Sequence, residues 1–347
     1  MLDAGWKRIA STSAPQSVCS SALSHANAVC FMYSTHSQNS YKMNIKTTCK
    51  ITVALDWTPN TIHSGLFVAS EKGFYSSVGL DVQLLPPDAT YSTTPAKRVE
   101  KGEADFAICP SESCIAYNES GKMRLQAIYA ILQSDASAIV STTLSCMEDL
   151  GRGTYASYNA RYEDNIVKTM VTAAGGDGNS MKIETSSGKL SLFDLVKQGK
   201  ADATWVFLPW EGLEAKLSGS TLHVFKAGDF GVPYGYSPVI ARNASSATLA
   251  TDTLERFVHA TRQGYLYAME HIDESISILK THCQPSRGVE FLAQSQGLIN
   301  EFYGDRSSLG MMEGKSWERW LDWLRSNNLL NTSDLQAGHL FTNEFFT

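Results

Sequence analysis

The chain contains no apolar run that approaches the roughly 18 to 20 residues needed to span a lipid bilayer. It also has no dense cluster of Lys and Arg, and its formal net charge is −6 at pH 7. Such clusters supply the attraction to a phosphate backbone, so we expect neither a membrane-spanning protein nor a nucleic-acid-binding one. With 347 residues, of which 43% are hydrophobic, the chain is long enough for two domains rather than one.

Closely spaced cysteine pairs are missing as well. The seven cysteines, at positions 19, 30, 49, 109, 114, 146 and 283, form no Cys-x-x-Cys motif, so we expect reduced thiols and no disulfide framework. Cys109 and Cys114 lie near the candidate site, but neither a histidine nor a third cysteine accompanies them. We therefore expect both to be small buried side chains, and we predict no metal site.

Residues 1–42 differ in composition from the rest of the chain. They are rich in Ser, contain Asp3 as their one acidic residue, and show neither strand nor helix periodicity. We recognise no secretory signal there, whereas an organelle-targeting segment, a disordered extension or a functional start at Met43 instead of Met1 all agree with the composition. We expect residues 1–48 to lie outside the fold and the protein to be cytoplasmic.

From Lys50 onward, strands alternate with helices, which is typical of an α/β protein with parallel sheets. The pattern predicts strands at 51–55, 79–85, 104–108, 125–132, 152–158, 181–184 and 201–207. It predicts helices at 93–101, 163–174 and 190–198. Apolar residues at helical spacing, including Leu254, Phe257, Trp317 and Trp320, indicate core helices nearer the C-terminus.

One short segment occurs twice. Lys-Gly-Glu-Ala-Asp-Phe-Ala at 101–107 recurs as Gln-Gly-Lys-Ala-Asp-Ala-Thr at 198–204. A common helix-to-strand turn would have this composition, because Gly adopts the left-handed conformation and Asp bonds the turn backbone. One copy in each half also fits two similar lobes that face a shared cleft. We predict that lobe 1 comprises residues 49–140 and 238–347 and that lobe 2 comprises residues 141–237.

Polar and aromatic residues directly follow the predicted strand at 51–55. Asp56, Trp57, Asn60 and His63 surround Pro59 and precede a helix. Ligands of α/β sheets lie beyond the C-terminal ends of the strands, so these groups and a helix N-terminus would converge on a ligand. The structural alternatives are a half-buried hinge position for the tryptophan and a capping role for the histidine.

Other predicted strand ends provide further candidates. Glu112 follows the strand at 104–108, where it either interacts with the helix dipole or binds a ligand. The remaining predicted ligand-binding residues are Tyr158, Asn159, Glu163, Trp205, Trp210, Glu211 and Tyr236. Aromatic residues at so many strand and loop ends indicate a sandwich for a flat ring. We assign no catalytic residue.

The segment 51–82 resembles the family that contains the bacterial periplasmic pyrimidine-binding proteins of thiamine salvage and the fungal thiamine pyrimidine synthases. The resemblance continues through Trp205 and the segments 102–107, 210–217, 236–240, 317–323 and 341–345, and the last of these are closer to the salvage-binding branch. It implies a two-lobed periplasmic-binding-protein type II fold, in which each lobe is a mostly parallel sheet flanked by helices and the ligand lies between the lobes. It also implies that Glu112 accepts hydrogen bonds from the exocyclic amine of an aminopyrimidine.

The synthase branch implies an enzyme that uses a lysine-bound pyridoxal phosphate, one of its own histidines and iron. Aligned through residues 102–107, the lysine position is occupied by Cys109 and the histidine position by Ser113. The clustered cysteines of the iron site are also missing from the sequence. Because the chemistry needs an imine-forming amine and metal ligands, this comparison weighs against catalysis.

We therefore expect a protein that binds a thiamine-related pyrimidine, such as hydroxymethyl- or formylaminopyrimidine, in thiamine biosynthesis or salvage, without a cofactor. A divergent thiamine pyrimidine synthase with pyridoxal phosphate and iron is the first alternative. A receptor for another small molecule, for instance a sulfonate or a flavin precursor, is the second. A membrane transporter would be a partner if the protein is exported.

Overall fold

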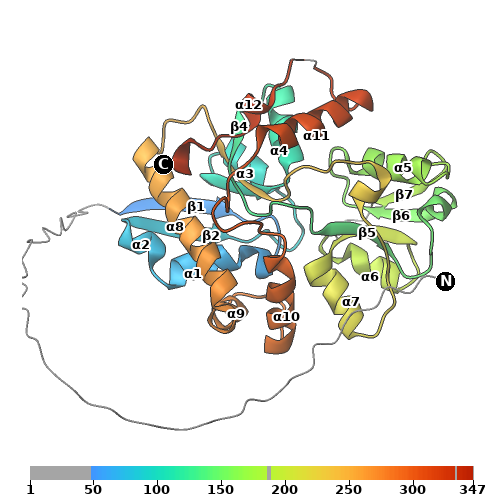
Figure 1. Ribbon diagram of the computed structural model, residues 1–347, viewed down its shortest axis with the longest axis horizontal. Coiled ribbons are helices and arrows are strands. Elements are labelled where there is room, and N and C mark those ends of the chain that lie inside the picture. Colours follow the sequence, from blue (N-terminus) through green and yellow to red (C-terminus); the bar gives the residue numbers. More distant parts are fainter. Residues whose placement is uncertain (1–47, 186–188, 333, 347) are drawn as a thin grey trace, which may run out of the picture. The chain divides into compact units, whose positions relative to one another are not determined.

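Two five-stranded sheets form the framework of the protein (Figure 1). The computed structural model describes residues 48–185, 189–332 and 334–346. Apart from Thr48, the segment that we expected to lie outside the fold is not among them, so the expectations for residues 1–48 stay predictions. None of the helices within the described ranges is long and apolar enough to cross a membrane.

The first sheet has the strand order β2-β1-β3-β10-β4. Its strands are β1 (Cys49–Ala54), β2 (Leu80–Leu85), β3 (Phe106–Cys109), β4 (Leu125–Ala130) and β10 (Val239–Asn243). β1 is parallel to β2 and β3, whereas β10 is antiparallel to β3 and β4. The sheet is thus mixed but mostly parallel, as expected: β1, β2, β3 and β4 run in one direction, and only β10 runs in the other, on its return from the second sheet.

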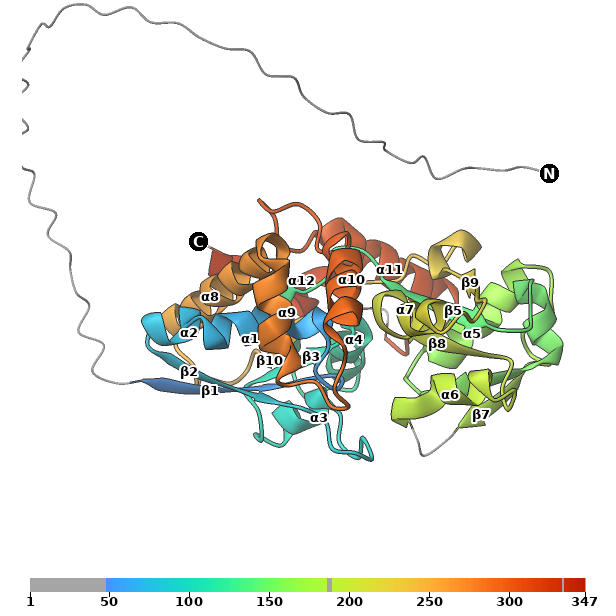
Figure 2. The ribbon, with the colours of Figure 1, turned by 90° about the horizontal axis from the view of Figure 1, so that it is seen from below.

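Helices cover both faces of this sheet. One face carries α1 (Ser64–Glu71), α2 (Phe74–Ser77), α8 (Thr251–Glu270), α9 (Ile272–Lys280) and α10 (Val289–Asn300). The other carries α3 (Pro95–Glu100), α4 (Ser111–Glu119), α11 (Gly314–Ser326) and α12 (Ala337–Leu340). Figure 2 shows α1 and α9 on one side of β1 and β2, and α3 on the other.

The side chains of the sheet alternate between these two helical layers. Ile51 and Val53 pack on the α1 side, while Ala54 packs on the α3 side. This alternation is the expected period of two for a strand that is covered on both faces. The predicted core positions are confirmed, because Leu254, Phe257, Trp317 and Trp320 are all at most 2% exposed.

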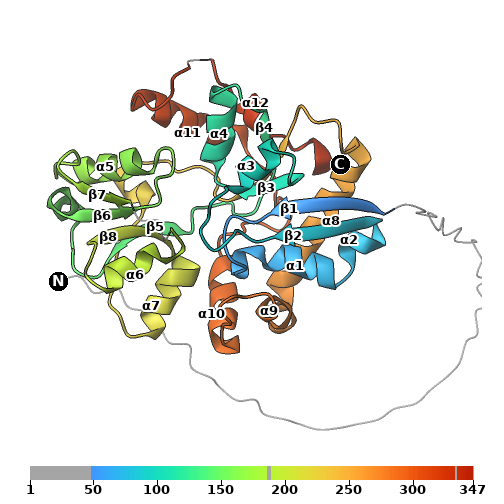
Figure 3. The same ribbon diagram turned by 180° about the vertical axis from the view of Figure 1, so that it is seen from behind.

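The second sheet has the order β7-β6-β8-β5-β9. It consists of β5 (Ser137–Ser141), β6 (Thr154–Ser157), β7 (Lys182–Thr185), β8 (Ala203–Phe207) and β9 (His223–Phe225), with α5 (Glu163–Ala173), α6 (Leu192–Lys197) and α7 (Leu213–Leu217) around it (Figure 3). β5 is antiparallel to both of its neighbours, so this sheet is mixed too. Because all of β5 pairs here, the chain enters the second sheet before residue 137, a few residues earlier than the lobe boundary we placed after residue 140.

The repeated Gly-x-Ala-Asp segment has the same role in both sheets. Gly102 and Gly199 end α3 and α6 in the left-handed conformation, with φ of 71° and 67°. Asp105 Oδ2 accepts a hydrogen bond from the backbone N–H of Thr52 in β1 at 2.8 Å, and Asp202 Oδ2 accepts one from the first residue of β6 at 2.7 Å. Each aspartate therefore joins two parallel strands, and the expectation of two similar lobes is confirmed.

Candidate functional site

A cavity of about 450 Å³ lies between the two sheets, beyond the C-terminal ends of β1, β3, β6 and β8. Its walls include residues that directly follow these four strands. The structure brings together most of the predicted site residues at this cavity, namely Asp56, Trp57, Asn60, Glu112, Tyr158, Asn159, Glu163, Trp205, Trp210 and Glu211. His63 and Tyr236 do not line it.

His63 lies behind the cavity wall and is fully buried. Its Nδ1 accepts the backbone N–H of Asn60 at 3.3 Å, and its Nε2 lies 2.8 Å from Asp56 Oδ1. An Nδ1 that accepts a hydrogen bond carries no proton, so the imidazole is neutral and donates from Nε2 to the carboxylate. His63 therefore orients Asp56 and caps the short helix η1 (Thr61–His63), instead of facing the cavity as we expected.

Aromatic rings from both lobes form one wall. The ring of Trp57 contacts Tyr158 edge-on, with centroids 5.9 Å apart, and lies 6.1 Å from the ring of Tyr91. Tyr91 belongs to the loop after β2 and has a positive φ of 51°. Strained φ values in non-glycine residues are often found at functional sites. This cluster offers stacking surface to a flat ligand.

Glu112 occupies the first turn of α4, just beyond β3. The backbone there is held in place because the N–H of Ser111 donates to the carbonyl of Tyr236 at 2.9 Å. Burial raises the pKa of the Glu112 carboxyl to about 7, and hydrogen bonding from Tyr234 and Ser111 opposes this rise. The carboxyl group is therefore poised between its acid and its ionised form near neutral pH, which is typical of functional carboxylates.

Glu163 organises the loop between β6 and α5. Its carboxylate accepts the backbone N–H groups of Tyr158 and Ala160, each at 3.0 Å, and the hydroxyl of Tyr155 at 2.7 Å. Burial nevertheless raises its pKa. With three donors already bound, Glu163 shapes the wall formed by Tyr158 and by Asn159, which has a φ of 57°.

The end of β8 and the segment after it supply further cavity residues from the same lobe as Glu163. Trp205 packs against Tyr234, with ring centroids 5.2 Å apart. Trp210 is only 7% exposed and packs edge-on against Phe291 of α10. Glu211 Oε2 accepts the backbone N–H of Phe207 at 3.1 Å, and burial raises the pKa of its carboxyl to about 7.

Tyr236 is directed away from the cavity, contrary to our expectation. Its hydroxyl accepts the backbone N–H of Glu313 at 2.9 Å, and its ring lies 6.0 Å from that of Trp317. The segment that contains it is irregular between η5 (Ala227–Phe230) and β10. Its neighbours Tyr234 and Ser237 line the cavity instead.

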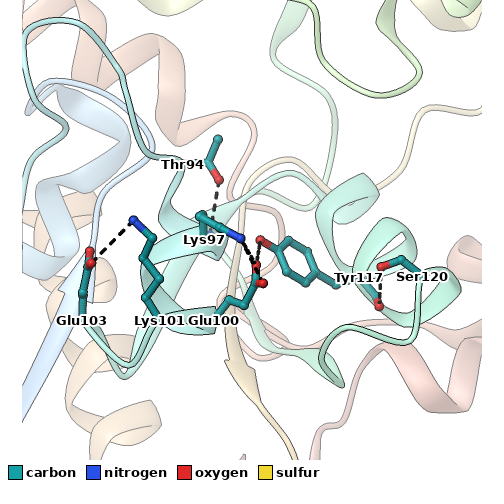
Figure 4. A network of polar contacts seen from close by, with 7 residues as sticks. All are labelled: Thr94, Lys97, Glu100, Lys101, Glu103, Tyr117 and Ser120. Carbon is teal, nitrogen blue, oxygen red and sulfur yellow. Dashed lines mark hydrogen bonds and ion pairs between the residues drawn. The ribbon is translucent and has the colours of Figure 1, made fainter.

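The prediction also omitted cavity residues on α3 and α4, which begin side by side at the cavity. Tyr117 lines the wall, and its hydroxyl donates to Glu100 Oε2 at 2.9 Å. This hydrogen bond joins α4 to α3, and Figure 4 shows that Glu100 also forms an ion pair with Lys97 of its own helix, at 2.9 Å. The Thr94 hydroxyl caps α3 through the N–H of Lys97. No local pattern could have revealed this link, because it depends on how two helices pack.

The cavity does not fit the cofactors of the synthase alternative. Within the part of the chain that the structure describes, neither a lysine nor a histidine lines it, and no group of three His, Cys, Asp or Glu side chains could hold a metal ion. Cys109 lines the cavity at the position of the synthase lysine and is 2% exposed. A thiol cannot form the imine that holds pyridoxal phosphate.

Two mixed α/β lobes with a ligand-sized cavity between them define the periplasmic-binding-protein type II class. The solved nitrate-binding protein NrtA of Synechocystis has this fold, with a TM-score of 0.67 at 15% identity, over 86% of this chain and 87% of that one. The alkanesulfonate-binding protein SsuA of Xanthomonas axonopodis gives 0.65 at 12% identity, over 85% and 99% of the two chains.

The chain belongs to the NMT1/THI5-like family, whose model matches residues 60–275. Among curated relatives, the formylaminopyrimidine-binding protein of Halalkalibacterium halodurans is 25% identical over 81% of this chain and 86% of its own. A 4-amino-5-hydroxymethyl-2-methylpyrimidine phosphate synthase of Legionella pneumophila is 23% identical over 66% of this chain and 72% of its own.

Proposed function

We propose that this protein binds a thiamine-related pyrimidine, such as hydroxymethyl- or formylaminopyrimidine, between its lobes and serves thiamine biosynthesis or salvage. The observation that carries the proposal is Glu112, a half-buried carboxyl group that lines a cavity walled by aromatic rings. An aminopyrimidine presents a flat ring for stacking and an exocyclic amine for this carboxyl group. The similarity to the formylaminopyrimidine-binding protein supports the same ligand class.

The charges around the cavity disfavour a receptor for anions. Four carboxyl groups line it, whereas Arg161 is the one Lys or Arg side chain among the described lining residues. Arg161 is already paired with Glu119. A sulfonate would therefore meet uncompensated negative charge, and sulfonate binding is the weaker candidate.

The proposal treats the protein as a binder without a cofactor. A two-lobed protein can couple ligand binding to closure, because contacts from both lobes form together only in the closed state. Delivery to a membrane transporter is the corresponding partner interaction. The solved structures of similar fold include a periplasmic sulphonate-binding protein of Escherichia coli, so the comparisons give no support to the cytoplasmic location that we expected from the sequence.

Native mass spectrometry and calorimetry with the full chain test the proposal. We expect hydroxymethylpyrimidine or formylaminopyrimidine to bind without a covalent change in protein mass, and Glu112→Gln to weaken binding about tenfold or more, because hydrogen bonds to a charged group contribute about 1.5 to 3 kcal/mol. Glu318→Gln, an exposed change on α11, is the matched control. A pyridoxal imine trapped by borohydride would instead identify an enzyme.

A further inference from the structure

The cavity contains a second group of aromatic and acidic residues, distinct from the surroundings of Glu112. The pKa of Glu112 is perturbed by Ser111, Tyr234 and Asp135. Glu211 is influenced by a different set, which includes Phe207, Glu214 and Arg287. The two half-buried carboxyl groups therefore have different neighbours within one cavity.

Aromatic rings accompany the second carboxyl group. Glu211 lines the same cavity as Tyr158, and its negative charge contributes to the raised pKa of this tyrosine. Tyr158 contacts Trp57, which in turn contacts Tyr91. Asp56, adjacent to Trp57 in the chain, acts on Tyr91 in the same way. Three contacting rings and two carboxyl groups thus line one cavity, a combination that favours cations through both ion pairing and cation–π attraction.

The negative charge in this group is not neutralised by its protein neighbours. The partner of Asp56 is the neutral imidazole of His63, so the pair retains a full negative charge. Arg287 lowers the pKa of Glu211 by its charge, but it does not line the cavity. It forms an ion pair with Glu214 at 2.9 Å and lies over the ring of Trp210. A half-buried carboxylate without a counter-ion is unfavourable, and a ligand cation would neutralise it.

We propose that Glu211, Asp56, Trp57, Tyr91 and Tyr158 form a subsite for a positively charged substituent on the ligand. This inference rests on the proposed function, because the ring that carries the substituent is the pyrimidine near Glu112. A cavity of about 450 Å³ lies within the range for ligands larger than a single ring. The preferred ligands are pyrimidines whose side arm ends in an ammonium group instead of a hydroxyl group.

A pair of ligands that differ in this one group tests the proposal by calorimetry at pH 7.5. The probes are 4-amino-5-hydroxymethyl-2-methylpyrimidine and its 5-aminomethyl analogue. We expect the full chain to bind the aminomethyl compound at least about tenfold more tightly, in line with about 1.4 kcal/mol per factor of ten. Glu211→Gln should remove most of that preference, whereas Glu318→Gln should keep it.

The possible results separate the two proposals. If both pyrimidines bind with equal affinity, or if Glu211→Gln weakens both equally, the cation subsite is refuted while pyrimidine binding stands. If neither compound binds to a folded protein but formylaminopyrimidine does, the subsite is refuted while the proposed function stands. If formylaminopyrimidine does not bind either, both proposals fail. Thermal melts of Glu211→Gln without ligand establish that the variant is folded.

Discussion

The Nε2 atom of His63 donates to Oδ1 of Asp56 over 2.8 Å, so a fully buried ring sets the direction of a carboxylate at the cavity wall. His63→Ala should lower the free energy of unfolding by about 2 to 3 kcal/mol, because it leaves a gap and unpaired polar groups. It should also weaken pyrimidine binding, although the ring does not reach the cavity.

The substitution Asp56→Asn removes the negative charge of the Asp56–His63 pair but keeps a side chain that His63 can orient. The amide oxygen can still accept the hydrogen bond of His63, so we expect little loss of stability by chemical denaturation and a selective loss of affinity for ammonium-bearing ligands. His271→Ala, at a half-exposed histidine outside the cavity, is the control. Unchanged ligand affinity in His63→Ala would contradict the orienting role.

Trp57 lies between rings of both lobes, and its removal should affect the ligand directly. Trp57→Ala should weaken pyrimidine binding about tenfold or more, because it removes a stacking surface that contributes about 1 kcal/mol in addition to buried area. Trp323→Ala on α11 provides the comparison, since Trp323 stacks on Trp320 and does not line the cavity. Equal affinities for the two variants in calorimetry would argue against stacking on Trp57.

Arg161 and Glu119 form an ion pair that joins the loop before α5 to the end of α4, and so links the two lobes. Glu119 has a 2% exposed side chain and also accepts the backbone N–H of Asn331. Arg161→Gln should speed ligand dissociation several-fold, in line with about 1 kcal/mol for a partly buried pair. Stopped-flow measurements would show this.

The control for the interlobe pair is Arg152→Gln. Arg152 is 86% exposed and pairs with Asp149 within its own lobe. Its replacement should leave dissociation rates unchanged. The interlobe pair has no role in closure if both arginine variants release ligand at the wild-type rate.

The buried carboxyl groups predict how stability depends on pH. The pKa of Glu112 and that of Glu211 are each raised to about 7 from 4.5, so the folded protein binds protons that the unfolded chain has released between these values. The free energy of unfolding should therefore decrease as pH rises from about 4.5 to 7, by up to about 1.4 kcal/mol per pH unit for each group. Urea titrations across this range should show a flatter profile for the double variant Glu112→Gln and Glu211→Gln. A profile as steep as that of the wild type would disprove the assignment.

Two glycines within helices should respond in opposite ways to the same substitution. A Cβ atom on Gly264 of α8 would lie 2.1 Å from the backbone oxygen of Gly65 in α1, where only backbone movement could relieve the clash. A Cβ atom on Gly297 of α10 would meet nothing within 4 Å. Gly264→Ala should therefore destabilise the protein by about 2 kcal/mol or more, whereas Gly297→Ala should stabilise it by about 0.5 to 1 kcal/mol. Thermal melts that give the same sign for both would contradict this packing.

The strand ends were predictable because apolar residues give way to polar and aromatic residues there. The apolar run at 51–55 breaks at Asp56 and Trp57, and such breaks at the ends of parallel strands mark the ligand edge of the sheet. The same reasoning located Glu112 after β3. The sequence does not reveal which residues of this turn face the cavity, because Asn60 and His63 lie only three positions apart. That choice depends on how η1 packs against Tyr265 and α10, which are distant in the sequence.

Residues that depend on long-range packing were missed or misplaced. Tyr91 reaches the cavity from an irregular loop, where Asp88 binds the hydroxyl and N–H groups of Thr90 and Ser92. The hydroxyl of Tyr236 points away from the cavity, because it accepts a hydrogen bond from the backbone N–H of Glu313, a residue distant in the sequence. The antiparallel direction of β10 was not predicted for a related reason. Its pairing with β3 and β4 joins segments that are more than a hundred residues apart.

The position of β10 also constrains the order in which the chain can assemble. β10 lies between β3 and β4 in the first sheet, yet every strand of the second sheet precedes it in the sequence. As the protein is synthesised, β5 to β9 are complete while β3 and β4 still lack the strand that joins them. The lobe that is encoded in the middle of the chain can therefore fold first, and the lobe that contains both ends of the described chain completes its sheet last.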